Sequence, residues 1–459
     1  MSSLFNQKLI CVAISSALLS GLALAIDAEK LPIGLASAFE QALENDPQWR
    51  SIQAQLAAEG EELGLARAEL LPRVQVTGGY YSKNSDVEFD QAIDDVGSGA
   101  GASTLDAGNL DYNGTGVSYG ATATQPGFNL AAIKAYRSAK ARDAGVELGL
   151  EGERQQLILR LATAYFQRLL AAENVSLAQS EQRAFEQQLE QTQQRFKVGL
   201  VTLTDVLEAQ AAFDQAHVQL AVAENEQAIE TENLAIILGE DVPIADLQSD
   251  LPLTMRRTEL QLWLDEVLQR NVTIRLAQLK VSQSDYALGA TRSSYWPTID
   301  LVASYNEIEE NQDSTVSQIG LQASWIPFQG GGLKARIQQA DYQYQQAQAE
   351  LRQAEQTIGR DARNQYKSQL TNITRIEAQQ RAIASSESAL KATKEGYRVG
   401  TRNVVDVLNA QRGLFQARRN YSQARHDWVL NRLQGQYLDS SLSKESLETV
   451  DQWLKSSTS

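Results

Sequence analysis

The chain has 459 residues, with 57 acidic and 41 basic side chains and a formal net charge of −16. This length is sufficient for several ordinary domains. The acidic balance argues against a nucleic-acid partner, which would need a basic face, and fits an acidic surface or a cavity that attracts cations. With one cysteine, the chain does not belong to the disulfide-rich class of exported proteins.

The first 25 residues are predicted to be a secretory signal peptide. Lys8 precedes an apolar run from Leu9 to Leu24, and Ala23-Leu24-Ala25 supplies an A-x-A cleavage site. The run is short for a membrane helix, and no later stretch has the apolar length that such a helix needs. Because Cys11 lies inside the signal, the mature chain is expected to have neither a thiol nor a lipid anchor. Loss of Lys8 would leave 40 basic and 57 acidic side chains, a net charge of −17.

Residues 26–239 are predicted to form the first of two repeats. Apolar residues at helical spacing predict one helix from Leu35 to Leu71. Apolar and polar residues then alternate at about 72–82 and again at about 117–126, which predicts two strands. The segment between them, 83–116, is rich in Gly, Asp and Ser and is predicted to be an exposed loop.

Two long helices follow the strands. Asn129–Phe196 contains no proline, and its Ala, Gln, Leu, Arg and Glu residues favour one continuous helix of roughly 100 Å at a rise of 1.5 Å per residue. A hairpin turn near Gly199 leads to a second helix, Leu203–Leu238. Residues 240–257, which include two prolines, are predicted to be a linker between the halves.

Residues 258–438 repeat the same order of elements. The predicted elements are a helix from Leu260 to Tyr295, strands at about 297–306 and 316–327, a helix from Leu333 to Tyr397, a hairpin turn near Gly400 and a last helix to about Tyr437. The offset between matching residues falls from 225 to 201, which the longer first loop mostly explains. A two-fold internal repeat is therefore predicted. Residues 439–459 are predicted to be a short polar tail.

The two hairpin turns carry the same motif. Gly199 and Gly400 suit the left-handed residue just past a helix C-terminus. Each turn continues into a cap residue with an acid three positions later, Thr202-x-x-Asp205 and Asn403-x-x-Asp406. The cap can accept from unpaired N–H groups, and the acid lies at the positive end of the helix dipole. A well-capped turn predicts a helical hairpin and by itself assigns no function.

The four strands have the length and alternation of transmembrane β-strands. Four strands cannot close a barrel, and open strand edges are not tolerated in lipid. If they span a bilayer, several chains must share one barrel, with twelve strands from three chains or sixteen from four. The alternative is a helical-hairpin protein with two small β-ribbons, such as a periplasmic adaptor or a coiled-coil spacer.

An enzyme is the least favoured class. The two histidines, His217 and His426, lie on predicted helices 209 residues apart. The sequence shows no phosphate loop, Cys/His metal cluster or nucleophile elbow. We therefore expect no catalytic residue, no metal site and no cofactor.

The sequence resembles the TolC family of outer-membrane efflux channels from about Leu35 to Tyr437. The motifs that carry the resemblance are Gly396-Tyr397-Arg398-Val399-Gly400-Thr401-Arg402 with Val405-Asp406-Val407-Leu408-Asn409-Ala410, Pro327-Phe328-Gln329-Gly330-Gly331, and Arg195-Phe196-Lys197-Val198-Gly199-Leu200-Val201 with Thr204-Asp205-Val206. The two-fold repeat is also a trait of this family.

The resemblance implies an α+β fold in which a homotrimer forms a twelve-stranded barrel and a long α-helical tunnel through the periplasm. The chain would then serve as the outer-membrane exit duct of a tripartite efflux or type I secretion system. Its partners would be a periplasmic adaptor, an inner-membrane transporter that supplies the energy, and outer-membrane lipid.

The resemblance also implies roles for residues at the hairpin tips. Residues matching Asp205, Tyr397 and Arg402 form a polar network that holds the tip closed in TolC-like channels. The residue matching Asp406 faces the lumen, where three copies make an acidic constriction. The family's best-known member has a second Asp at the position of Asn409, so this chain is expected to bind cations more weakly at its tip.

Overall fold

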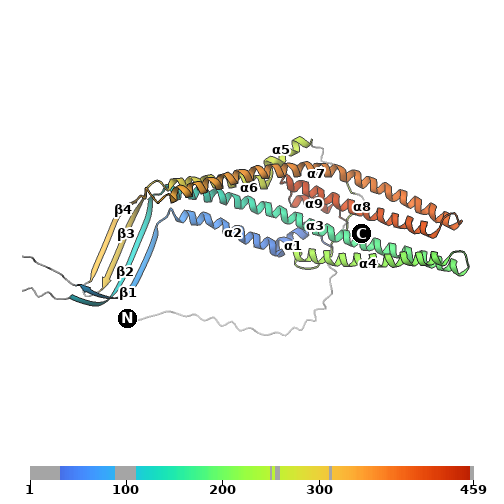
Figure 1. The fold of residues 1–459 in the computed structure, drawn as a ribbon, viewed down its shortest axis with the longest axis horizontal. Helices are drawn as coiled ribbons and strands as arrows, with labels where there is room; N and C mark the ends of the chain where they lie inside the picture. The colour runs from blue at the N-terminus through green and yellow to red at the C-terminus, as the bar shows by residue number, and fades with distance from the viewer. Residues whose placement is uncertain (1–31, 88–109, 249–250, 254–258, 310–312, 455–459) are drawn as a thin grey trace, which may run out of the picture.

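The structure, a computed structural model, describes residues 32–87, 110–248, 251–253, 259–309 and 313–454. The predicted signal peptide and the middle of the predicted loop 83–116 lie outside these residues. The molecule is elongated, with a four-stranded sheet at one end and the tips of two helical hairpins at the other (Figure 1).

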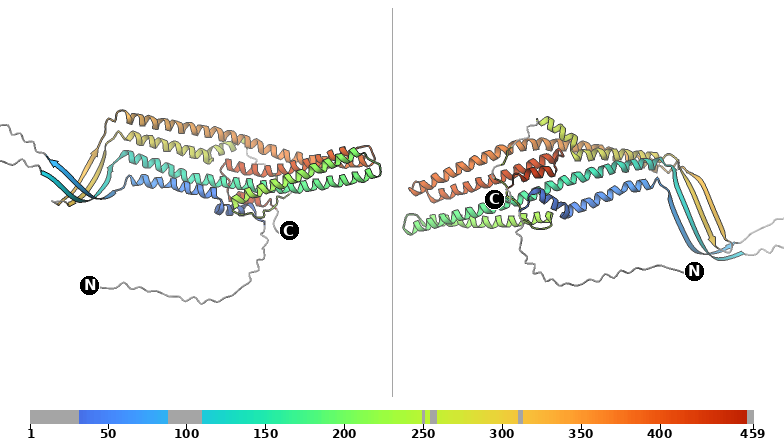
Figure 2. Two further views of the ribbon diagram at one scale, coloured as in Figure 1. Left: turned by 60° about the horizontal axis from the view of Figure 1, so that its bottom comes forward. Right: turned by 180° about the vertical axis from the view of Figure 1, so that it is seen from behind.

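Two helical hairpins give the molecule its length. Helix α3 (Leu130–Lys197) has 68 residues and α7 (Gly332–Arg398) has 67, so each is roughly 100 Å long. The shorter arms are α4 (Leu203–Leu238) and α8 (Val404–Leu438), each running back beside its long partner. These four helices occupy the stretches where the sequence predicts them. Both hairpin tips lie at the same end in all views (Figures 1 and 2).

Each half was predicted to begin with one continuous helix, and this was wrong in both halves. The structure has α1 (Leu35–Asn45) and α2 (Pro47–Ala68) in the first half, and α5 (Leu260–Arg270) and α6 (Val272–Ser293) in the second. The breaks fall at Asp46 and Asn271, whose ψ angles of 115° and 125° lie outside the helical region. Pro47 disfavours the helical conformation for Asp46. Both side chains also cap the helix that follows, accepting from Trp49 N and Ile274 N.

The strands form one antiparallel sheet in the order β1-β2-β3-β4. Their bounds are β1 Arg73–Val87, β2 Leu110–Phe128, β3 Thr298–Glu309 and β4 Ser314–Ser324. The prediction of a loop over 83–116 was wrong at both ends, because β1 and β2 stay paired from Tyr81 and Gly116 out to Val87 and Leu110. Ladder hydrogen bonds hold this glycine-rich segment extended, a contribution that its composition does not reveal.

The largest apolar core lies midway along the molecule, where α1 packs against α3 and α4, and α8 packs against the same two helices. The residues predicted as a polar tail join this core, so that prediction was wrong. Helix α9 (Lys444–Asp451) buries Leu447 and Val450, and Trp453 is buried just beyond it. The predicted linker also contributes to this core, with Val242, Ala245 and Leu247 buried. Isolated bridges pair Ile244 with Ile33 and Leu247 with Leu454. Across the described ranges, no helix is apolar and long enough to cross a membrane.

Candidate functional site: the hairpin tips and the sheet

The two hairpin turns have the same backbone geometry. Gly199 and Gly400 have φ of +74° and +81°, the left-handed region that penalises a Cβ. In the first turn, Gly199 N donates to Phe196 O at 2.9 Å and Leu200 N donates to Arg195 O at 2.9 Å. In the second, Thr401 N donates to Gly396 O at 2.9 Å. This pattern closes each long helix, as expected for a glycine just past a helix C-terminus.

Both predicted acids lie in capping boxes. Thr202 N donates to Asp205 Oδ2 at 2.8 Å, and Asp205 N donates to Thr202 Oγ1 at 3.2 Å. In the second turn, Asn403 N donates to Asp406 Oδ2 at 3.2 Å, and Asp406 N donates to Asn403 Oδ1 at 2.8 Å. The reciprocal bonds satisfy backbone donors that the helix itself leaves unpaired. Each carboxylate is only half-buried, so capping leaves part of it accessible.

Arg402 lies over the end of α7. A Cβ built on Gly396 would meet Arg402 Cγ at 2.7 Å, so this glycine leaves room for the arginine stem. The exposed guanidinium is 4.0 Å from Asp406 Oδ2. Asn409, one turn further along α8, accepts a hydrogen bond from Arg412 at 2.9 Å.

Tyr397 is in a different environment. It packs against a small apolar cluster to which both hairpins contribute, and Arg195 Cζ lies 4.6 Å from the ring centroid. Its hydroxyl is buried and has no hydrogen-bond partner among the described residues. Within that same part of the chain, no hydrogen bond or ion pair joins Asp205 to Tyr397 or Arg402. One chain therefore does not form the predicted network by itself.

A small apolar core holds the two hairpins together near their tips. We call it the tip cluster. It consists of Phe185 from α3, Ala212 and Ala216 from α4, and Val404 and Leu408 from α8. A cavity of about 590 Å³ lies nearby between α3, α7 and α8, lined in part by Arg195, Tyr397 and Gln411. Sequence reasoning missed Arg195 and Gln411, since neither an arginine at a helix end nor one glutamine among many stands out.

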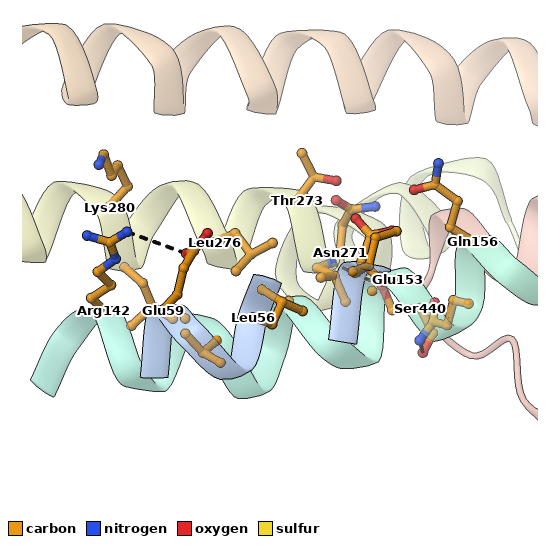
Figure 3. A pocket seen from close by; sticks show the side chains of 18 of the residues that line it. Leu56, Glu59, Arg142, Glu153, Gln156, Asn271, Thr273, Leu276, Lys280 and Ser440 are labelled. Atoms are coloured by element: carbon orange, nitrogen blue, oxygen red, sulfur yellow. Dashed lines mark hydrogen bonds and ion pairs between the residues drawn. The ribbon is translucent and has the colours of Figure 1, made fainter. Parts of the chain in front are cut away.

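A second cavity, of about 470 Å³, lies nearer the sheet between α2, α3 and α6. Figure 3 shows Glu59 of α2 beside Arg142 of α3, with Lys280 of α6 beyond them and Leu56 further along α2. Arg142 pairs with Glu59 at 3.6 Å and with Glu62 at 2.5 Å. Because Arg142 is paired with these two carboxylates, we interpret the cavity as a packing feature of the helical wall.

The sheet has one mainly apolar and one mainly polar face, because its register places similar residues side by side in several rows across the four strands. One row of directly paired residues consists of Val74, Ala123, Ala303 and Ile319. The next row, on the opposite face, consists of Gln75, Thr122, Ser304 and Gln318. The apolar face is uncovered: Val76, Ile319 and Leu321 are 75–77% exposed. Trp325 and Phe328 add exposed aromatic rings where β4 meets the helices.

Comparisons with known proteins agree on one family. The family model described as "Outer membrane efflux protein" matches residues 38–240 and 263–434. The chain is 30% identical to the outer membrane protein TolC of Vibrio cholerae, over 98% of this chain and 99% of the relative. It is 28% identical to the protease secretion protein PrtF of Dickeya chrysanthemi, over 92% of each chain.

Solved structures share the fold. The CmeC outer membrane channel of Campylobacter jejuni superposes with a TM-score of 0.76 at 15% identity, covering 98% of this chain and 99% of that one. The outer membrane protein VceC of Vibrio cholerae gives 0.74 at 17% identity, covering 88% and 96%. Because the family model spans most of the chain, the adaptor and spacer alternatives are not favoured. The chain belongs to the outer membrane efflux protein family, as a TolC-like outer-membrane exit duct that extends into the periplasm.

Proposed function

We propose that three copies of this chain share one twelve-stranded barrel in the outer membrane. The supporting observation is the sheet: its apolar face is exposed, and in the described chain β1 and β4 each pair on one side only. An unpaired edge is not tolerated in lipid, so the edges must pair with other copies. The long helices of the three copies would continue the barrel as a tunnel through the periplasm.

The tunnel would receive its cargo from an inner-membrane transporter through a periplasmic adaptor, and the transporter would supply the energy. The names of the relatives support this role, since they include a protease secretion protein and a probable efflux pump outer membrane protein, TtgC of Pseudomonas putida. We expect the protein to fractionate with outer membranes and to need detergent for extraction. Recovery as a soluble periplasmic monomer would contradict the proposal.

The tip hairpins would form a gate at the periplasmic end, with Asp205, Tyr397 and Arg402 in a polar network across neighbouring chains. Two observations support an intermolecular network. Arg402 is exposed, and among the described residues its guanidinium reaches only Asp406, at 4.0 Å. Nor does any bond in that part of the chain join it to Asp205. The exposed guanidinium and the half-buried Asp205 carboxylate are therefore available to another copy.

Single-channel conductance in planar bilayers tests the gate. The double variant Tyr397→Ala, Arg402→Ser should conduct several times more than the unmodified channel, because both changes remove groups that hold the tips together. Arg412→Ser is a matched control, since this exposed arginine lies on α8 beyond the turn and bonds only to Asn409 among the described residues. An unchanged conductance in the double variant would remove Tyr397 and Arg402 from the gate.

Asp406 would contribute a separate feature, an acidic constriction made by three copies at the tip. Its half-buried carboxylate is compatible with this role, because capping leaves part of the group accessible. Asp406→Asn should reduce block by multivalent cations added from the periplasmic side, since it removes the negative charge while the amide oxygen can still accept the capping bond. Equal block in both channels would assign Asp406 to capping alone.

A further inference from the structure

Arg195 and Tyr397 form a contact between the two hairpins at the tip end. Arg195 is in the last turn of α3, and Tyr397 is in the last turn of α7. The guanidinium carbon lies 4.6 Å from the ring centroid. The other cation–π contacts in the described chain span 5.2–5.8 Å, so this one is the closest of the set. A guanidinium over the face of an aromatic ring is attracted by the negative charge density there.

The Arg195 side chain has no competing partner in the described ranges. Two acids line the cavity beside it, Glu190 and Glu395. Glu395 pairs with Arg398 at 2.6 Å, and no ion pair or side-chain hydrogen bond is found for Arg195 itself. Its half-buried guanidinium is therefore directed to the ring and not to a carboxylate.

Tyr397 makes two kinds of contact. It packs against the tip cluster, to which α3, α4 and α8 all contribute. Arg195 adds a contact from the end of α3. Since the hydroxyl has no partner among the described residues, the ring, and not the hydroxyl, ties α7 to the first hairpin within one chain. Any motion that separates the hairpins at their tips must break this contact.

We propose that Arg195 is a positioning residue of the tip gate: it clamps the Tyr397 ring against the first hairpin and thereby favours the closed arrangement. The inference rests on the gate proposed above, and it adds a residue to which the family resemblance gave no role. The loss of one contact of this strength shifts a closed–open equilibrium by about two- to tenfold in each chain.

The test is a double-mutant cycle measured as single-channel conductance. Arg195→Gln should raise conductance severalfold, and Arg195→Lys should raise it less, because lysine keeps a cation but not the planar guanidinium. Lys197→Gln is the control, since this exposed residue carries the same charge at the same helix end. An equal increase in Lys197→Gln would mean that the entrance charge, and not the clamp, is responsible, and would overturn the inference.

The cycle also separates the clamp from the gate. Arg195→Gln should add little conductance to Tyr397→Leu, where the ring is already lost, and should keep its effect in Tyr397→Phe, where the ring remains. If Tyr397→Leu raises conductance and Arg195→Gln does not, the role inferred for Arg195 is wrong, while the proposed gate is still supported. If Tyr397→Leu leaves conductance unchanged, both proposals fall. Recovery of each variant from the outer membrane confirms that it has folded.

Discussion

His426 is a buried titratable residue in the middle of the molecule, far from the tips. Its side chain on α8 is 1% exposed, with the ring edge against Phe166 and Nδ1 3.0 Å from Ser422 O. In the described chain, Nε2 has no partner. Burial lowers the pKa of His426 below its ordinary value of 6.5, and the nearby Glu173 carboxylate on α3 only partly opposes this. Of the other charged neighbours, Arg425 also lowers the pKa and Asp427 raises it.

The lowered pKa makes stability depend on pH. Between the folded-state pKa and 6.5 the unfolded chain binds more protons than the folded chain, so stability is lost as pH falls below 6.5. We expect the midpoint of thermal unfolding to decrease over this window, and His426→Gln to reduce that decrease because glutamine does not titrate. His217→Gln, at the exposed histidine, should leave the pH dependence intact. If the unfolding midpoint of His426→Gln still falls with pH as steeply as that of the unmodified protein, His426 is not the cause of the pH dependence.

At the residue scale, local sequence predicts local contacts. The two capping boxes follow from a cap residue and an acid three positions apart, and the structure contains both. The Arg195–Tyr397 contact joins residues about 200 positions apart, and nothing in the local pattern of either helix indicates it. The same holds for Asp451, which accepts from Leu35 N at 2.5 Å and from Ala36 N at 3.0 Å, more than 400 positions away.

At the element scale, α9 shows why the predicted polar tail was wrong. Leu447, Val450 and Trp453 are spaced three residues apart and are all buried, but Lys, Glu and Ser residues dominate the segment around them. So short an apolar stripe is a weak helix signal in a sequence. Tertiary contacts stabilise this helix: its end caps α1 through Asp451, and its apolar side completes the central core.

The burial of α9 predicts the effect of removing one side chain from it. Leu447 is 0% exposed, so Leu447→Ala should lower stability by about 2–5 kcal/mol. The measurement is the midpoint of thermal unfolding in detergent, monitored by the circular dichroism signal of the helices. Glu448→Ala, at the exposed neighbouring residue, should change the midpoint little. Equal midpoints for the two variants would mean that α9 does not stabilise the core.

At the scale of the whole molecule, alternation in the sequence predicts the strands, but register decides what the sheet can do. A shift of one residue between any two strands would mix apolar and polar rows on the same face. The observed pairing keeps one face mainly apolar and the other mainly polar from β1 to β4, although four helices, α3 to α6, separate β2 and β3 in sequence. Neither this pairing nor the uncovered apolar face could be derived from the strands one at a time.

The two faces predict opposite responses to the same substitution on adjacent residues. Ile319 is 75% exposed on the apolar face, and Gln318 is exposed on the polar face. Ile319→Arg should prevent recovery of assembled channel from the outer membrane, because an arginine facing lipid near the bilayer midplane costs about 2–4 kcal/mol in each chain. Gln318→Arg should assemble normally, since its side chain would face the water-filled interior of the barrel. The measurement is the amount of assembled channel that detergent extracts from the outer membrane for each variant. Normal assembly of both, or failure of both, would show that the sheet does not place Ile319 in lipid.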